Sequence, residues 1–135
     1  MEKRITIGNR VISEDSPAFI IAEMSANHNM DFDRAVAIMQ AAKDAGADAI
    51  KIQTYTADTI TLDCDDPCFQ ITQGTLWDGT TLHKLYETAY TPWEWQPKLK
   101  KIAEEMGLIF FSSPFDLSAV DFADIFDISR TGSGV

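Results

Sequence analysis

Apolar residues gather in three short runs along the chain, and each run predicts a β-strand. The runs are Ala18–Ala22, Ala47–Thr54 and Leu108–Phe111. The first is continuous, as is typical of a strand that is covered on both faces in a parallel sheet. Ahead of these runs, alternating residues flank a Gly-Asn pair within Arg4–Ile12, which predicts a short β-hairpin.

Helical spacing of apolar residues predicts a first helix between the first two strands. Asp31 is a natural N-cap for this helix, and Gly46 ends it. The apolar stripe at helical spacing consists of Phe32, Ala35, Val36, Met39 and Ala42.

Two further helices are predicted around the third strand. Thr91–Glu94 has the sequence of a capping box with proline at the first helical position. Pro97 indicates that this turn is separate from a helix over Lys98–Met106. Ser118 and Asp121 are predicted to cap the last helix.

Strands that alternate with helices predict an α/β fold with a parallel sheet. Two architectures fit, a doubly wound open sheet and a (β/α)8 barrel. The residues after the first strand carry no glycine-rich phosphate fingerprint, which weakens a dinucleotide-binding interpretation. A barrel typically needs about 250 residues. With 135 residues, the chain is predicted to be either a piece of a barrel or a smaller fold.

Composition narrows the class of protein. Hydrophobic residues make up 45% of the chain and charged residues 24%, which is typical of a soluble globular protein. The net charge is −10, and no basic stripe is present to neutralise phosphates, which argues against a nucleic-acid partner. No apolar run approaches the ~20 residues of a membrane span, and the first residues lack a secretory signal, so we expect a cytoplasmic protein without a membrane partner. Cys64 and Cys68 are expected to be reduced loop cysteines.

Each predicted strand is apolar for most of its length and becomes polar near its carboxyl end. The first runs into Glu23, the second carries Lys51 and Gln53, and the third runs into Ser112 and Ser113. Ligands bind at the carboxyl ends of the strands in parallel α/β folds. The sequence therefore predicts a polar site at this edge of the sheet.

Alternation along the second strand places a lysine on the face opposite the isoleucines. Ile50 and Ile52 share one face, whereas Lys51 and Gln53 share the other. A lysine on an inner face is costly unless an anion meets it, which favours a substrate phosphate or carboxylate. The alternatives are an internal ion pair and a lysine that reaches solvent from an edge strand. Glu23 is a candidate general base, general acid or sugar-hydroxyl acceptor, or simply the partner of Lys51.

Other polar residues are weaker candidates. Ser112 and Ser113 could donate hydroxyls to phosphate oxygens or could form only a Ser-Pro turn. His28 lies in a polar loop after the first strand and is a candidate sugar ligand. His83 has no partner nearby in sequence, and we expect it at the surface.

The segment Tyr55–Tyr90 is much longer than an ordinary strand-to-helix connection of about 2–6 residues. It contains a Trp-Asp-Gly turn and a short helical pattern over 82–89. Loops of this length on a ligand-binding face act as lids or specificity elements, and the alternative is a structural insertion.

Several motifs resemble the strand signatures of the sialic acid synthase family, in the same order and spacing. The three strand signatures are found at 19–29, 46–54 and 111–116. The segments 76–82 and 89–95, which are rich in tryptophan, resemble the pseudaminic acid branch of that family. The resemblance extends to about Phe122.

The resemblance implies that 1–122 is the N-terminal part of a (β/α)8 TIM barrel, preceded by the short hairpin. It also implies a full-length parent that works as a homodimer. The family continues with a helix and a fourth strand that carries another lysine. Residues 123–135 do not match that continuation, and we expect them to be a divergent, flexible tail.

The resemblance also implies an activity, the condensation of phosphoenolpyruvate with a 2,4-diacetamido-2,4,6-trideoxy hexose during surface-glycan biosynthesis. Mn²⁺ or Mg²⁺ would polarise the sugar aldehyde, and its ligands would lie downstream of this chain. The implied roles are Glu23 at the reacting carbons, Lys51 and Ser113 on phosphoenolpyruvate, Gln53 near the metal-bound water, and Asn27 and His28 in substrate binding.

Three hypotheses about function remain open at this point. The first is an enzyme fragment whose parent makes pseudaminic acid. The second is a synthase of the same family that makes a neuraminic- or legionaminic-type acid. The third is an inactive or purely structural piece, whose exposed sheet edges would promote aggregation or association with a partner.

Overall fold

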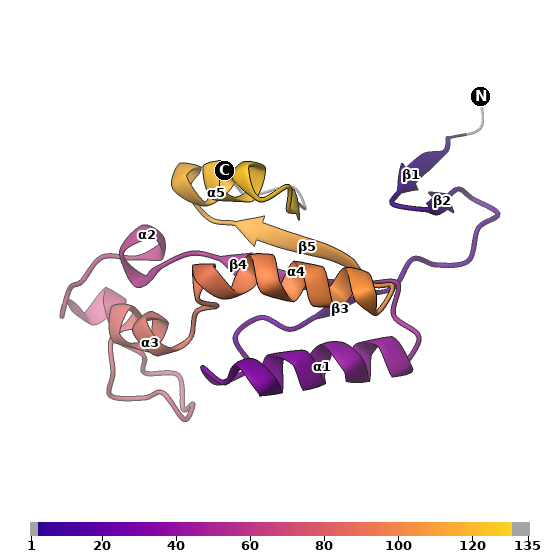
Figure 1. The fold of residues 1–135 in the computed structure, drawn as a ribbon. Helices are drawn as coiled ribbons and strands as arrows, with labels where there is room; N and C mark the ends of the chain where they lie inside the picture. The colour runs from indigo at the N-terminus through magenta and orange to yellow at the C-terminus, as the bar shows by residue number, and fades with distance from the viewer. Residues whose placement is uncertain (1–2, 131–135) are drawn as a thin grey trace.

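The strands form a four-stranded parallel sheet and a separate two-stranded antiparallel hairpin (Figure 1). The computed structural model describes residues 3–130. The sheet has the order β3-β4-β5-β6, with strands Ile21–Glu23, Ala49–Thr54, Ile109–Pro114 and Ser129–Arg130. The hairpin consists of β1, Ile5–Ile7, and β2, Arg10–Ile12. The α/β class and the hairpin are therefore confirmed.

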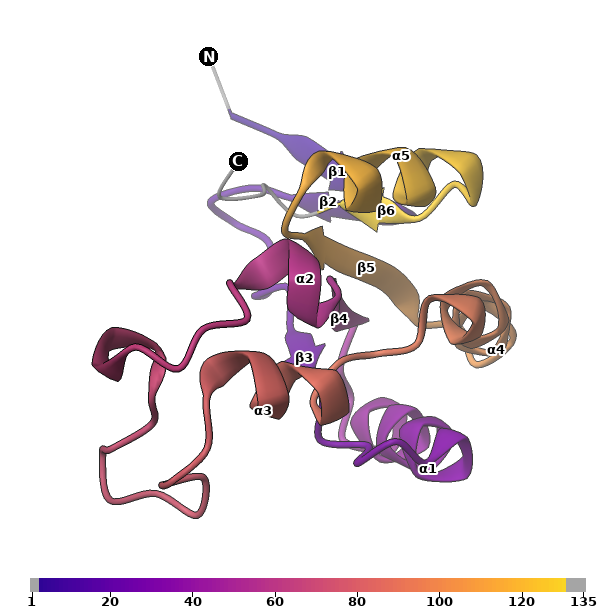
Figure 2. The ribbon, with the colours of Figure 1, turned by 90° about the vertical axis from the view of Figure 1, so that its left-hand side faces the viewer.

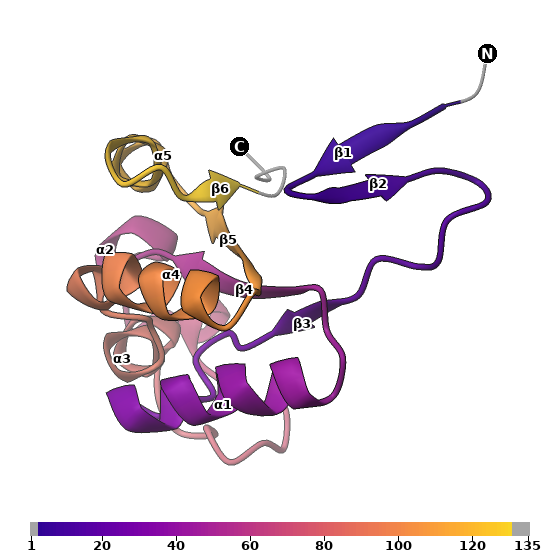
Figure 3. The same cartoon turned by 45° about the vertical axis from the view of Figure 1, so that its right-hand side comes forward.

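Three longer helices cover one face of the sheet, and the shorter helices all fall between β4 and β5 along the chain (Figures 1–3). The longer helices are α1, Phe32–Asp44; α4, Gln96–Glu105; and α5, Leu117–Ile125. The shorter ones are α2, Ala57–Ile60; η1, Pro67–Phe69; α3, Leu82–Thr88; and η2, Trp93–Trp95. Nowhere in the described part of the chain does a helix have the length and apolar character of a membrane span.

The core lies between the sheet and the three longer helices. Ile50 and Ile52 are fully buried there, which confirms the predicted inner and outer faces of β4. The other buried core residues are Met24, Ala35, Met39, Leu99, Ala103, Leu108, Phe110, Ala123 and Ile128. Burying an aliphatic side chain contributes about 1.5–3 kcal/mol, so this layer provides much of the driving force for folding.

Contacts of Arg10 and Gly8 attach the hairpin to the amino ends of β4 and β5, and Figure 3 shows the hairpin standing apart from the helices. Arg10 forms an ion pair with Asp48, the residue before β4, and the other carboxylate oxygen of Asp48 accepts a hydrogen bond from the Ile20 amide at 2.8 Å. Gly8 has a φ of +57° and lies against Ile109, so that a Cβ at this position would come within 2.8 Å of the isoleucine Cδ1. Glycine is thus required both by the turn and by this close approach.

The cap of α1 is as predicted, whereas two other predicted caps are wrong. Asp31 accepts a hydrogen bond from the Arg34 amide at 3.0 Å and begins α1. The predicted capping box at Thr91 does not form, because the threonine hydroxyl bonds elsewhere and α4 begins only at Gln96. The turn η2 before α4 is separate, as Pro97 indicated. At α5 the cap is Asp116, not Ser118.

The flexible tail predicted for 123–135 is wrong over 123–130. Helix α5 continues through Ile125, and Ala123 and Ile128 are buried. Ser129 then pairs in parallel with Phe111 and opens β6, a fourth strand of the sheet. The two buried apolar residues anchor this segment, although its sequence did not match the expected pattern. The rest of the predicted tail, 131–135, lies outside the described residues.

A substitution pair tests whether the helix-covered layer holds the fold together. Ile52→Ala removes three carbons from a fully buried position and should lower the free energy of unfolding by about 2–5 kcal/mol. Ile125→Ala removes the same atoms from a side chain that is 75% exposed and should change it by less than about 0.5 kcal/mol. Urea unfolding followed by circular dichroism measures both, and equal losses would contradict the placement of the core.

Candidate functional site

Four polar side chains gather on the face of the sheet that the helices leave uncovered. In the parallel register, Glu23 of β3 lies beside Lys51 of β4, and Gln53 lies beside Ser113 of β5. Register partners on parallel strands point to the same face, and neighbouring strands lie about 4.8 Å apart. The structure therefore brings the candidates from all three predicted strands together at one edge.

Lys51 and Glu23 form an ion pair on this face. β4 lies between β3 and β5, so a lysine that reaches solvent from an edge strand is excluded. The ion pair that the sequence left open is present but only partly internal, with the lysine side chain 23% exposed and the glutamate side chain 55% exposed. An ammonium group carries three N–H donors, so one carboxylate oxygen leaves it able to bind a further anion.

An aromatic surface lies next to the ion pair. Phe111 is the register partner of Lys51 on β5 and is buried. Phe19 packs edge-on against Phe111, with ring centroids 6.4 Å apart. Apolar neighbours lower the local dielectric constant and strengthen the attraction between the ammonium group and any anion. The site thus combines one cation with an apolar, aromatic surface.

The two serines at the end of β5 face opposite sides of the sheet. Ser113 lies on the same face as Gln53, and both side chains are partly buried. Ser112 instead points to the helix-covered face, where it is fully buried and hydrogen-bonded to the Thr54 hydroxyl. Of the two hydroxyls proposed from sequence, only that of Ser113 is placed to meet a ligand beside Lys51.

Asn27 and His28 lie in the loop that follows β3. The loop is tightly turned, since Ser25, Asn29 and Met30 all have positive φ values of 50°, 50° and 56°. Asn27 is exposed, and its side-chain amide donates to the Met24 carbonyl at 2.9 Å. This hydrogen bond holds the amide against the first turn of the loop and leaves its oxygen able to accept from a ligand.

His28 is fully buried, and both of its ring nitrogens are hydrogen-bonded. Nδ1 accepts from the Met30 amide at 3.1 Å, so the ring proton is on Nε2, which donates to the Thr91 hydroxyl at 3.1 Å. Burial lowers the pKa of His28 below its usual value, which favours this neutral form. A direct contact with a sugar stays a prediction, and it would require the ring to leave this position.

His83 was predicted at the surface, and that prediction is wrong. The residue is 7% exposed, and its Nε2 lies 2.8 Å from Asp58 of α2, with Asp63 3.9 Å from Nδ1. The hydrogen bond to Asp58, helped by the nearby charges of Asp63 and Glu87, raises the pKa of His83. The pair links α2 to α3 across 25 residues, a separation that no sequence spacing reveals.

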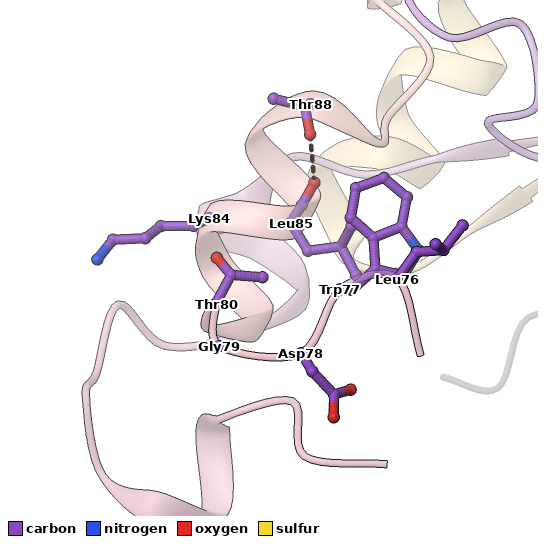
Figure 4. A pocket seen from close by; sticks show the side chains of 8 residues that line it. All are labelled: Leu76, Trp77, Asp78, Gly79, Thr80, Lys84, Leu85 and Thr88. Atoms are coloured by element: carbon purple, nitrogen blue, oxygen red, sulfur yellow. Dashed lines mark hydrogen bonds between the residues drawn. The ribbon is translucent and has the colours of Figure 1, made fainter. Parts of the chain in front are cut away.

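The long connection between β4 and α4 carries two hollows. One, of about 290 Å³, is lined by Thr56, Ala57, Asp58, His83, Glu87 and Tyr90. The other, of about 310 Å³, lies between the Trp77–Gly79 turn and α3 (Figure 4). Backbone amides of Gly74 and Thr75 donate to Asp78, each at 2.9 Å, and lower its pKa. These bonds fix the turn and present the exposed Leu76 and Trp77 to solvent.

The residues described here do not make a metal site by themselves. Within 3–130, no group of three or more histidine, cysteine, aspartate or glutamate side chains is placed to hold a metal ion. Cys64 and Cys68 are both free thiols. A metal that served this site would need ligands from outside the described residues.

Comparison with known proteins identifies a consistent set of relatives. A sequence model described as the NeuB family matches residues 38–131. The pseudaminic acid synthase of Campylobacter jejuni is 49% identical over 121 residues, which cover 90% of this chain and 34% of that protein. The corresponding synthase of Helicobacter pylori is 44% identical over 108 residues, covering 80% of this chain and 32% of that protein. The chain thus spans about a third of the length of these relatives.

More distant relatives match most of the chain in sequence or in structure. The N,N'-diacetyllegionaminic acid synthase of Legionella pneumophila is 31% identical over 112 residues, covering 83% of this chain and 31% of that protein. Among solved structures, the N-acetylneuraminic acid synthetase of Leptospira borgpetersenii, in complex with citrate, superposes with a TM-score of 0.76 at 26% identity. The match covers 95% of this chain and 40% of that chain.

The buried neutral histidine predicts how stability depends on pH. A folded-state pKa below the unfolded value of 6.5 means that the contribution of His28 is fully present above pH 6.5 and is lost as pH falls through the folded pKa. Urea unfolding between about pH 7.5 and 5.5 should therefore show a steeper loss of stability in the wild type than in His28→Asn. Equal slopes for the two proteins would contradict the neutral, buried assignment.

Proposed function

The chain belongs to the NeuB family, and on this premise we propose that it is the N-terminal part of a synthase that condenses phosphoenolpyruvate with an amino-sugar. We propose that its parallel sheet is the first portion of a (β/α)8 barrel. Four parallel strands with helices on a single face support this, because a sheet that curls into such a barrel keeps its helices outside. The uncovered face, with Lys51, would then line the barrel interior.

The observation that carries the proposal is the ion pair of Lys51 and Glu23 beside Gln53 and Ser113. Phosphoenolpyruvate carries a phosphate and a carboxylate, and a lysine beside an aromatic wall is suited to bind either group. Ser113 and Gln53 supply a hydroxyl and an amide for orienting the bound molecule. Glu23 is the carboxylate nearest to the lysine and is therefore assigned the proton transfers.

In the proposed reaction, C3 of phosphoenolpyruvate forms a bond to the aldehyde carbon of the open-chain sugar. The aldehyde oxygen gains a proton, water adds at C2, and the C2–O bond breaks so that inorganic phosphate leaves. One phosphoenolpyruvate, one sugar and one water thus give one nonulosonic acid and one phosphate. Lys51 and Ser113 hold the phosphoenolpyruvate, Gln53 orients water, and Glu23 moves protons at the reacting carbons.

A divalent cation, Mn²⁺ or Mg²⁺, would act as a Lewis acid on the sugar aldehyde. The described residues do not fit a metal site on their own, so we assign its ligands to parts of the protein beyond this chain. The roles assigned here to Lys51, Ser113 and Glu23 do not depend on it. We further propose that the full-length parent is a homodimer.

The choice of sugar rests on the degree of similarity. The chain is 49% and 44% identical to two pseudaminic acid synthases but 31% identical to a legionaminic acid synthase. We therefore propose a 2,4-diacetamido-2,4,6-trideoxy hexose of the pseudaminic type as the substrate. The second candidate is the legionaminic-type sugar, which the more distant relative favours.

Phosphate release from phosphoenolpyruvate, with metal present, tests these assignments in a full-length version of the protein and in the 135-residue chain. We expect activity only in the full-length protein, because the metal ligands are assigned outside this chain. Each candidate sugar is supplied in turn, and faster release with the legionaminic precursor would overturn the choice of sugar. Release by the short chain alone would contradict the need for later strands.

Removing the site cation should weaken binding of the anion. Lys51→Met keeps most of the side-chain volume, and losing a charge-assisted hydrogen bond should weaken phosphoenolpyruvate binding about 10- to 100-fold. Calorimetric titration of the full-length protein measures this dissociation constant. Lys98→Met, an exposed lysine on α4, is the matched control and should bind as the wild type does. Unchanged binding by Lys51→Met would overturn the proposed site.

A further inference from the structure

The segment Thr91–Gln96 lies on the helix-covered side of the sheet and contacts the carboxyl ends of β3 and β4. It is linked to the carboxyl end of β5 through Thr54 of β4. Near β3, the Thr91 hydroxyl bonds to His28 at 3.1 Å and lies 3.5 Å from the Ser25 carbonyl. Behind β4, the indole N–H of Trp93 donates to the Tyr55 carbonyl at 3.0 Å. The segment therefore connects strand ends whose opposite face carries the candidate site.

The contact between β4 and β5 is a chain of three fully buried polar groups. The Thr54 hydroxyl donates to Gln96 Oε1 at 2.8 Å. Because its single proton is used in this way, the Thr54 oxygen must accept its second hydrogen bond from the Ser112 hydroxyl. Each proton in the chain Ser112 to Thr54 to Gln96 thus has one assigned direction.

The arrangement carries a cost in stability. Gln96 Nε2 is a buried donor without a hydrogen-bond partner among residues 3–130. A leucine of similar size would fill the same space without leaving such a group, so packing alone does not explain a glutamine here. Partly satisfied polar groups that persist in a core indicate a requirement other than stability.

The neighbours of Thr54 and Ser112 in sequence are the candidate site residues on the other face of the sheet, and they supply such a requirement. Thr54 directly follows Gln53, and Ser112 directly precedes Ser113. Successive strand residues point to opposite faces, so a hydrogen bond that fixes Thr54 and Ser112 also fixes the backbone that aims their neighbours. Gln53 and Ser113 are register partners on β4 and β5. Thr54 pairs with Pro114 and Ser112 with Ile52, so the hydrogen bond between Thr54 and Ser112 runs diagonally from one strand to the other.

We propose that Thr54, Ser112 and Gln96 form a positioning network, which aims Gln53 and Ser113 at the bound substrate from behind the sheet. This inference rests on the proposed function, because it assigns a purpose to residues that would not touch the substrate themselves. Misplacing a binding group by about 1 Å can reduce a rate 100-fold, so fixing two strand ends from behind has a direct functional consequence.

Two substitutions at one position separate positioning from packing. Thr54→Val keeps the branched shape but loses the hydroxyl, whereas Thr54→Ser keeps the hydroxyl but loses a methyl group. If the network positions the site, binding should follow the hydroxyl. If Thr54 only packs, binding should follow the methyl group or should not change. Thr72→Val, at an exposed position, is the matched control.

Two measurements are made on each variant. Calorimetry on the full-length protein gives the dissociation constant for phosphoenolpyruvate, which we expect to rise about tenfold in Thr54→Val and by less than about twofold in Thr54→Ser. Amide hydrogen exchange of the same full-length protein, without ligand, reports local opening of the backbone. We expect the Gln53 and Ser113 amides to exchange faster in Thr54→Val, while the Met39 amide in α1 is unchanged.

The two measurements distinguish the positioning network from the proposed function. Equal acceleration of all three amides would indicate a general loss of stability and would overturn the network. Unchanged exchange at Gln53 and Ser113 would also overturn it. If the wild-type protein fails to bind phosphoenolpyruvate, the proposed function fails, and local exchange still decides whether the network fixes the two strand ends.

Discussion

Side-chain alternation along β4 is the constraint on which the rest of the structure depends. Ile50 and Ile52 must be buried beneath the helices, and this fixes Lys51 and Gln53 on the uncovered face. A register shift by one residue would bury the ammonium group in the apolar core, at a cost far larger than any local adjustment could offset. The hydrophobic layer and the position of the charged site are therefore set by the same six residues.

The cost of Lys51 explains why its surroundings are arranged as they are. Glu23 supplies a partner charge in the unliganded state, and Phe111 shields one side of the pair. The glutamate remains half exposed, so an incoming anion can reach the ammonium group without first breaking a buried ion pair. In the described residues β3 pairs only with β4 and β6 only with β5, which leaves two strand edges open. Open edges are stabilised by further strands, in agreement with relatives about three times as long.

Sequence reasoning recovered what depends on local pattern and missed what depends on packing between distant segments. The hairpin, α1 with its Asp31 cap and the two faces of β4 follow from alternation, helical spacing and cap chemistry. The bonds of His83 to Asp58 and of Thr54 to Gln96 join residues 25 and 42 positions apart, and no spacing rule connects them. The sequence held one signal for the second pair. Thr54 follows Ile50 and Ile52 at every second position of β4, so its hydroxyl had to point into the buried, helix-covered side of the sheet.

The carboxyl end of β4 differs from the rest of the strand in being polar on both faces. From Ala49 to Ile52, one face is apolar and packs under the helices, but at Thr54 that face also carries a hydroxyl. Apolar packing tolerates small shifts because it lacks direction, whereas a chain of hydrogen bonds with assigned donors fixes backbone positions along defined lines. A site that must aim an amide and a hydroxyl at one small molecule needs the second kind of support. Directional bonds therefore replace core packing at the point where the strand meets its proposed ligand. The cost in stability is the Gln96 Nε2 group, a buried donor that finds no hydrogen-bond partner within residues 3–130.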